Sequence, residues 1–301
     1  MPSPDTHSTS SVDRKIFWWL LRYPLQRVED LVLALSVSTN TIYRHLNRLV
    51  EEGQVEYITP SLNVQSTCRL YHLSNDGLLA AAALEGADIK TLSSEWGSNE
   101  QGMLRLLPRL PALLTLQDVV NGLTAQASTM LAHTGGYRAN ISWHWQRDYR
   151  HTFSSQEGTL TWNADAALLF YRKAAPLTAR ANGSSEAAYY SALLFLDAGL
   201  TGMYDQQFIT SRLEMLLRYR DQRESKDLSP LPFPPLLVIT LTPLQRETWQ
   251  RCVAALALAR AAPVLSGAII CLDQQASTDS IWTQPWQQLS TRAPCRLVDL
   301  F

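Results

Sequence analysis

One stretch of the chain, residues 27–73, constrains the fold more than any other. Apolar residues at helical spacing predict a short helix over 27–35 and a second helix from Ser38 or Thr39 to about Glu52. Gly53 follows where a helix commonly ends in the left-handed conformation. Two strand-like runs, 54–59 and 68–73, then flank a polar loop. Together with helices expected at 13–23 and 74–85, this order predicts a winged helix-turn-helix.

The helix expected at 39–52 has two different faces. Its apolar residues fall at i, i+4, i+7 and i+8, so they form one buried stripe: Ile42, Leu46, Leu49 and Val50. The other face is polar and is our candidate DNA-reading surface. Arginine can read guanine edges and asparagine can read adenine edges, whereas tyrosine, threonine and further arginines suit phosphates. We expect base contacts from Asn40, Arg44 and Asn47, phosphate contacts from Thr41, Tyr43 and Arg48, and help from Arg69 beside the wing.

Charge limits this interpretation. The whole chain has a net charge of −1, and residues 1–90 hold eight Lys and Arg against ten Asp and Glu. A domain of net charge −2 lacks the broad basic field that drives non-specific DNA binding. We therefore expect a homodimer, because two half-sites double the phosphate contacts. The alternative is that the polar helix face is only solvated and that the domain is a protein–protein adaptor.

Composition predicts a soluble, cytoplasmic chain of two domains. Hydrophobic residues make up 46% of the 301 residues, enough for two cores. The four cysteines form no C-x-x-C pair, the N-terminus has no apolar signal core, and Arg260 and Pro263 interrupt the longest apolar run. We expect a disordered tail at 1–11, the winged helix at 12–88, a connector at 89–111 and a second domain at 112–301. No phosphate-binding loop or metal-ligand spacing occurs, so we expect no cofactor and no metal.

The second domain follows an α/β pattern. A helix at 113–133 precedes strand-like runs at 138–153, 159–171 and 189–196. A helix at 202–221, a strand at 236–241, a helix from Pro243 with Thr242 as its N-cap, and a strand at 266–272 complete it. This order predicts a restriction-endonuclease-like fold. Trp282 and Trp286 in the tail are either core residues or an exposed cluster that docks a partner.

A nuclease of that fold holds divalent metal with acids on neighbouring strands. Asp165 and Asp197 are the candidates, but Gly199 stands where an acid-x-Lys motif has its lysine. A carboxylate pair without a nearby cation to position the attacking water makes a poor nuclease site. We therefore expect a degenerate domain that contacts the DNA backbone or a partner.

The chain resembles the replication-relaxation family, proteins of bacterial plasmids and other mobile elements. The resemblance rests on RHLNRLVEEGQV and RLYHLSNDGL in the first domain. In the second it rests on NADAALLF, on FLDAG with the arginine-rich helix around Arg212 to Arg220, and on FPPLLVIT. Phe195 stands where the family has an acidic residue. The resemblance implies a winged helix with a nuclease-like domain, double-stranded DNA as partner at replication or transfer loci, and possible contact with a replication or relaxase protein.

These observations favour a sequence-specific DNA-binding protein without catalysis, acting in replication, transfer or transcriptional control. A metal-dependent nuclease using Asp165 and Asp197 and a protein–protein adaptor stay open as alternatives.

Overall fold

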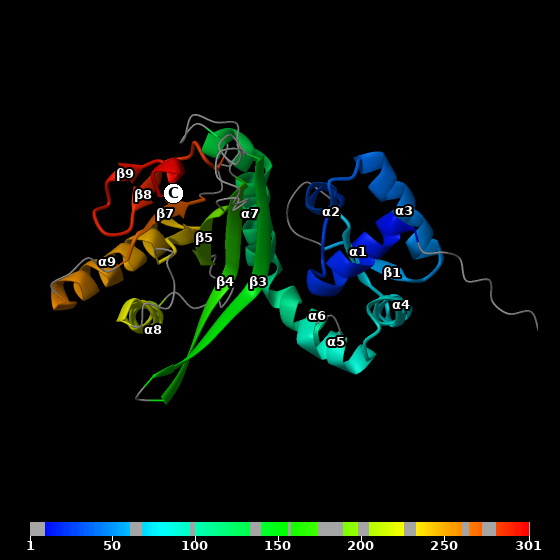
Figure 1. The fold of residues 1–301 in the computed structure, drawn as a ribbon, viewed down its shortest axis with the longest axis horizontal. Coiled ribbons are helices and arrows are strands. Elements are labelled where there is room, and N and C mark those ends of the chain that lie inside the picture. Colours follow the sequence, from blue (N-terminus) through cyan, green and yellow to red (C-terminus); the bar gives the residue numbers. More distant parts are fainter. Residues whose placement is uncertain are drawn as a thin grey trace, which may run out of the picture. The chain divides into compact units, whose positions relative to one another are not determined.

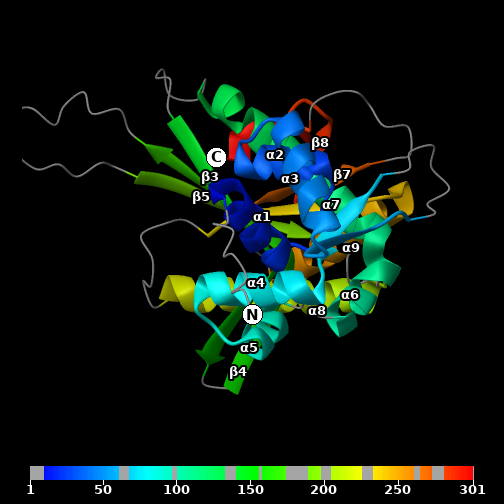
Figure 2. The same cartoon turned by 90° about the vertical axis from the view of Figure 1, so that its right-hand side faces the viewer.

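The computed structural model describes residues 10–60, 68–96, 100–132, 140–155, 158–173, 189–197, 205–225, 233–260, 265–272 and 281–300. Within these ranges the chain is a mixed α and β protein with a two-stranded and a seven-stranded sheet (Figures 1 and 2). It divides into two compact units, Met1–Leu110 and Pro111–Phe301. None of the helices in the described ranges combines the length and apolar character that a membrane span requires.

The first unit has the element order of a winged helix. Helix α3 follows α2 after a short turn, and an antiparallel strand pair follows α3, with Val55 opposite Leu73 and Ile58 opposite Leu70. Of the wing loop expected at 60–67, residues 61–67 lie outside the described residues. The elements are α1 (Ser11–Arg22), α2 (Val28–Leu35), α3 (Thr39–Glu51), β1 (Val55–Ile58), β2 (Leu70–Leu73) and α4 (Asn75–Glu85).

Apolar side chains from every one of these elements are buried. The predicted stripe of α3 is largely confirmed: Ile42, Leu46 and Leu49 are at most 1% exposed, whereas Val50 is half-buried. Ile16 and Leu20 of α1 are fully buried as well. Each such side chain stabilises the fold by about 1.5–3 kcal/mol relative to an exposed one. This burial fixes which face of α3 is left to solvent.

Two expected boundaries differ in the structure. Helix α1 begins at Ser11, because the Ser10 side chain accepts a hydrogen bond from the Asp13 backbone and the Asp13 side chain accepts one from the Ser10 backbone. The expected start at Asp13 is therefore two residues late, and the rest of the expected tail, 1–9, lies outside the described residues. The segment expected as a connector, 89–111, contains helices: α5 (Ile89–Trp96), α6 (Glu100–Leu106) and the 3-10 helix η1 (Leu107–Arg109).

The second unit is built on the seven-stranded sheet, in the order β3-β4-β5-β6-β7-β8-β9. Strands β5, β6 and β7 are parallel, and the other neighbouring pairs are antiparallel. The elements up to β7 follow the expected order, and β8 and β9 were not predicted. They are α7 (Leu110–Ala132), β3 (Asn140–Ser155), β4 (Gly158–Lys173), β5 (Tyr189–Asp197), α8 (Gln206–Ser225), β6 (Leu236–Thr240), α9 (Pro243–Arg260), β7 (Gly267–Cys271), β8 (Trp286–Gln288), β9 (Pro294–Cys295) and the 3-10 helix η2 (Leu297–Leu300).

Helices cover both faces of this sheet. Leu236 and Val238 of β6 lie in a core with residues of α8 and α9, so the alternate residues Leu237 and Ile239 face the other way. On that other side α7 is held by Trp282, whose indole N–H donates to the Leu123 carbonyl at 3.1 Å. Figure 1 shows α7 on the side of the long strands away from α8 and α9. The unit is therefore a three-layer sandwich.

The C-terminal tryptophans are core residues. Trp282 is 2% exposed and Trp286 is fully buried, with its indole N–H donating to the Ile281 carbonyl at 2.8 Å. The alternative of an exposed docking cluster is therefore wrong, because both rings have hydrogen-bond partners inside the unit.

Candidate nucleic-acid interface

Helix α3 starts and ends where its sequence predicts. The Ser38 side chain accepts a hydrogen bond from the Thr41 backbone N–H at 3.4 Å and so caps the first turn. Gly53 follows the helix with a φ of +71°, a conformation that costs glycine little. Both boundaries are therefore encoded locally.

The candidate DNA-reading residues are divided by exposure. The side chains of Asn40, Tyr43, Arg44 and Asn47 are exposed on α3. Thr41 is half-buried, and its hydroxyl lies 2.8 Å from the Ser38 hydroxyl. Among the described residues, no carboxylate pairs with the Arg44 guanidinium. Arg44 is thus an uncompensated cation on the open face of the helix.

Arg48 has a different setting from the one expected of a phosphate contact. Its guanidinium lies 2.6 Å from Asp13 of α1 through Nη2 and 2.8 Å from Glu52 through Nη1. His45 Nδ1 lies 2.7 Å from the other Asp13 oxygen. Two carboxylates therefore engage Arg48, and its contact with Asp13 ties α3 to α1. The predicted phosphate contact of Arg48 stays a prediction.

Asp13 is the centre of this network and was absent from the sequence-based candidates. Its side chain is 3% exposed. Burial by itself would raise the pKa of Asp13, but hydrogen bonds from Ser10, His45 and Arg48 outweigh it and hold the pKa below the ordinary value of 3.8. The Ser10-x-x-Asp13 spacing was a usable signal for the cap, whereas the contacts with α3 span 32 residues and had no local signal.

Arg69 lies just before β2 and is exposed. Its guanidinium carbon lies 4.4 Å from the centre of the Tyr57 ring, and that ring packs against Tyr71 at 5.8 Å between centroids. This stacking keeps the cation beside the base of the wing without neutralising it.

The two candidate metal ligands of the second unit are buried acids on adjacent strands. Asp165 and Asp197 are each 4% exposed. Because Ala166 pairs with Leu196 in antiparallel register, Asp165 and Asp197 are the next opposing positions. Arg212 of α8 places Nη1 3.1 Å from Asp197 Oδ2, and its Nη2 donates to the Asn163 carbonyl at 2.8 Å.

This geometry weakens the nuclease alternative. A carboxylate oxygen engaged by a half-buried guanidinium is a poor ligand for a divalent cation, because the cation would have to displace Arg212. Among the described residues, no group of three or more His, Cys, Asp or Glu could hold a metal ion. Asp197 is therefore an ion-pair partner of α8 in this structure.

Further arginines of the C-terminal helices are also engaged. Arg220 and Arg260, from α8 and α9, each lie 2.8 Å from a carboxylate oxygen of Asp221. Burial by itself would raise the pKa of Asp221, but these two cations lower it. Arg212 and Arg220 are thus structural ion-pair partners, which reduces the cationic surface that α8 could offer to DNA.

Comparisons with known proteins add little. No protein-family model and no curated protein matches the chain. A solved structure, the transcriptional regulator SlyA, is similar at 17% identity with a TM-score of 0.22, over 37% of this chain and 78% of that one. At this TM-score the likeness supports no conclusion about fold or function.

Proposed function

We propose that the N-terminal unit binds double-stranded DNA at specific sites and places α3 in the major groove. The observation that carries the proposal is the open face of α3, where the uncompensated guanidinium of Arg44 lies between the exposed amides of Asn40 and Asn47. Residues 40, 44 and 47 follow helical spacing and share one face. These side-chain types form the specific contacts with guanine and adenine edges.

The attachment of α3 to the rest of the unit supports sequence-specific recognition of DNA bases, in addition to contacts with the phosphate charge. Base discrimination requires that the helix hold its side chains in one orientation relative to the groove. The buried stripe fixes the rotation of α3, and the Asp13–His45–Arg48 contacts tie it to α1. The exposed amides and guanidinium are thus presented from a rigid element.

Charge pairing in the unit indicates how strong this binding is. Arg27 pairs with Asp30 at 2.9 Å and Arg48 pairs with Asp13 and Glu52, so these cations are already compensated. Arg44 and Arg69 are the cations that we assign to DNA. Two such contacts per chain give a weak complex, and we include a homodimer on two half-sites in the proposal.

The test is selection of bound duplexes from a random DNA pool, followed by fluorescence anisotropy with the selected site. Arg44→Ala should weaken binding to that site about 10- to 100-fold, the value of one bidentate base contact, and relax preference at one base pair. Arg105→Ala, which removes an exposed arginine from α6, is the matched control and should bind as wild type. Light scattering with and without the duplex reports the number of chains bound.

Two outcomes would overturn the proposal. If no duplex is enriched, the unit does not read DNA and the protein–protein adaptor is favoured. If Arg44→Ala and Arg105→Ala both bind like wild type, α3 is not the reading element. Circular dichroism of each variant shows whether the helices are intact.

A further inference from the structure

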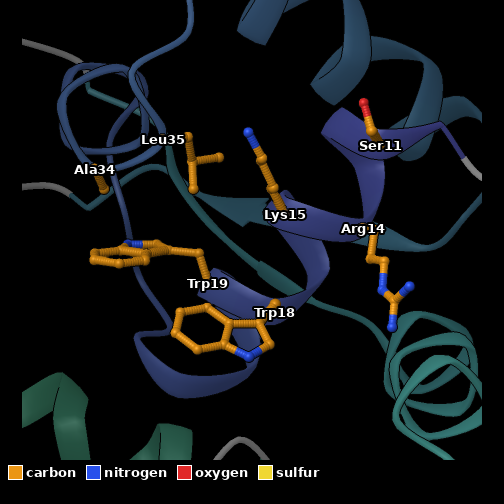
Figure 3. A pocket seen from close by; sticks show the side chains of 7 residues that line it. All are labelled: Ser11, Arg14, Lys15, Trp18, Trp19, Ala34 and Leu35. Carbon is orange, nitrogen blue, oxygen red and sulfur yellow. The ribbon is translucent and has the colours of Figure 1, made fainter.

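A pocket lies beside α1, and none of its lining residues is among the candidate DNA-reading side chains. It has a cavity volume of about 550 Å³ and is lined by α1 and the end of α2. Figure 3 shows the seven side chains that line it. They are Ser11, Arg14, Lys15, Trp18, Trp19, Ala34 and Leu35.

The walls of the pocket are aromatic and apolar. Trp19 is buried, and its indole N–H is already satisfied by the Gln26 side chain at 3.1 Å, so it offers the pocket an apolar ring. The guanidinium of Arg22 lies 3.5 Å from the centre of the Trp18 ring and holds that ring in place. Ala34 and Leu35 are both half-buried and add aliphatic surface from α2. A flat hydrophobic group would find preformed walls here.

The rim of the pocket is cationic. Lys15 and Arg14 are exposed, and among the described residues neither has an ion-pair partner. The neighbouring acid, Asp13, is engaged by His45 and Arg48 and does not compensate them. In Figure 3 the Lys15 ammonium rises beside Leu35, whereas the Arg14 guanidinium points in a different direction. Lys15 is therefore the cation best placed to meet a charge on a molecule that lies against Trp19.

We propose that this pocket binds a small organic anion, with an aromatic body against Trp18 and Trp19 and a carboxylate on Lys15. Ligand sites are commonly apolar cavities of about 300–1,000 Å³ with a few polar groups that set orientation, and this pocket has both properties. The proposal does not depend on DNA binding, since the pocket residues and the exposed face of α3 are different.

The test is calorimetric titration of the full chain, without DNA, using naphthoate as the probe. Naphthalenemethanol has a similar body without the charge and serves as the neutral comparison. Naphthoate should bind in a saturable way, and at least about tenfold more tightly than the neutral compound, because an uncompensated ammonium attracts the carboxylate. Raising the salt concentration should reduce the difference in affinity between naphthoate and naphthalenemethanol, because salt screens the attraction between the ammonium and the carboxylate.

Variants locate the site. Lys15→Gln should weaken naphthoate binding about tenfold and leave naphthalenemethanol unchanged. Lys90→Gln removes another exposed lysine and should bind like wild type. Ala34→Phe should fill the cavity and abolish binding of both compounds. Urea unfolding shows whether Ala34→Phe is folded, and the lysine variants test the site if it is not.

Three results would overturn the proposal. Absence of any binding heat at millimolar naphthoate would show that the pocket takes no such anion. Equal affinity for the charged and neutral compounds would leave Lys15 without a role. Equal weakening by Lys15→Gln and Lys90→Gln would place the anion elsewhere. None of these results bears on whether α3 binds DNA.

Discussion

His45 Nδ1 lies 2.7 Å from Asp13 Oδ1, although the two residues are 32 positions apart in the chain. The second carboxylate oxygen, Asp13 Oδ2, lies 2.6 Å from Arg48 Nη2. One carboxylate of α1 therefore holds two consecutive turns of α3, the helix that we propose reads DNA. The orientation of α3 depends on a buried charge that is itself part of the α1 cap.

The first prediction concerns this charge. Asp13→Asn keeps the size of the side chain but removes the charge that His45 and Arg48 contact. We expect the free energy of unfolding to fall by about 2 kcal/mol, because hydrogen bonds between charged groups contribute about twice as much as neutral ones. Urea denaturation followed by circular dichroism measures it.

Asp88→Asn is the matched control. Asp88 also caps a helix, accepting from the Thr91 backbone N–H at 3.1 Å, but that cap is exposed. Asparagine caps as well as aspartate, so the control should unfold like wild type. If Asp13→Asn also unfolds like wild type, Asp13 acts only as a cap and its contacts with α3 contribute no stability.

The second prediction follows from the lowered pKa of Asp13. A carboxylate whose pKa is lower in the folded chain stabilises the fold above its unfolded pKa, near 3.8, and this stabilisation is lost as the pH falls through the folded value. The difference in unfolding free energy between wild type and Asp13→Asn should therefore shrink as the pH falls below 3.8. Urea titrations at several pH values check this, and a difference that stays constant or grows as the pH falls below 3.8 would contradict it.

The third prediction concerns the second unit. Arg212→Ala should lower the free energy of unfolding by about 3 kcal/mol, because it leaves the Asp197 carboxylate buried without this cation. The Arg212 side chain is only 11% exposed, so solvent screens the pair weakly. Arg218→Ala removes an exposed arginine from the same helix and should change the free energy of unfolding by less than about 0.5 kcal/mol.

A double-mutant cycle separates the pair from the packing of Arg212. Asp197→Ala combined with Arg212→Ala should lower the free energy of unfolding by less than the sum of the two single changes, because the double variant removes both charges of the pair. Strict additivity would mean that the two side chains do not interact.

The fourth prediction concerns Gly77 in the first turn of α4. Alanine is usually the better helix former by about 1 kcal/mol, so helix propensity predicts that Gly77→Ala is stabilising. In the fold, a Cβ at this position would lie 1.9 Å from the Gln54 carbonyl oxygen. We therefore expect a loss of about 2 kcal/mol from overpacking, measured as a lower urea midpoint. An unchanged or raised midpoint would show that the close approach relaxes without cost.

Local signals in the sequence located several elements accurately. Thr242 and Pro243 predicted the start of α9, and there the Thr242 hydroxyl accepts from the Gln245 backbone N–H at 3.2 Å. The Gln245 side chain in turn accepts from the Thr242 backbone N–H at 3.1 Å. Caps and apolar spacing act within one or two helical turns, so they can be read without knowing the tertiary fold.

Partners of charged side chains were not predictable in this way. The spacing on α3 predicts a phosphate contact for Arg48, and no spacing signal predicts a partner for Arg212. In the structure Arg48 pairs with Asp13 and Arg212 pairs with Asp197, each a buried carboxylate from another element. Residue spacing shows which face of a helix a cation occupies but not which acid the fold brings to it.

The sequence by itself determined where the main helices and strands lie and which face of α3 is apolar, since propensity, capping and periodicity act over neighbouring residues. Only the tertiary structure decided that Trp282 and Trp286 are buried, that Arg48 holds α3 to α1, and that a cationic aromatic pocket lies beside α1. The physical reason is the sequence separation of the residues that interact. Burial and ion pairing depend on residues distant in the chain that packing brings within a few ångströms of one another.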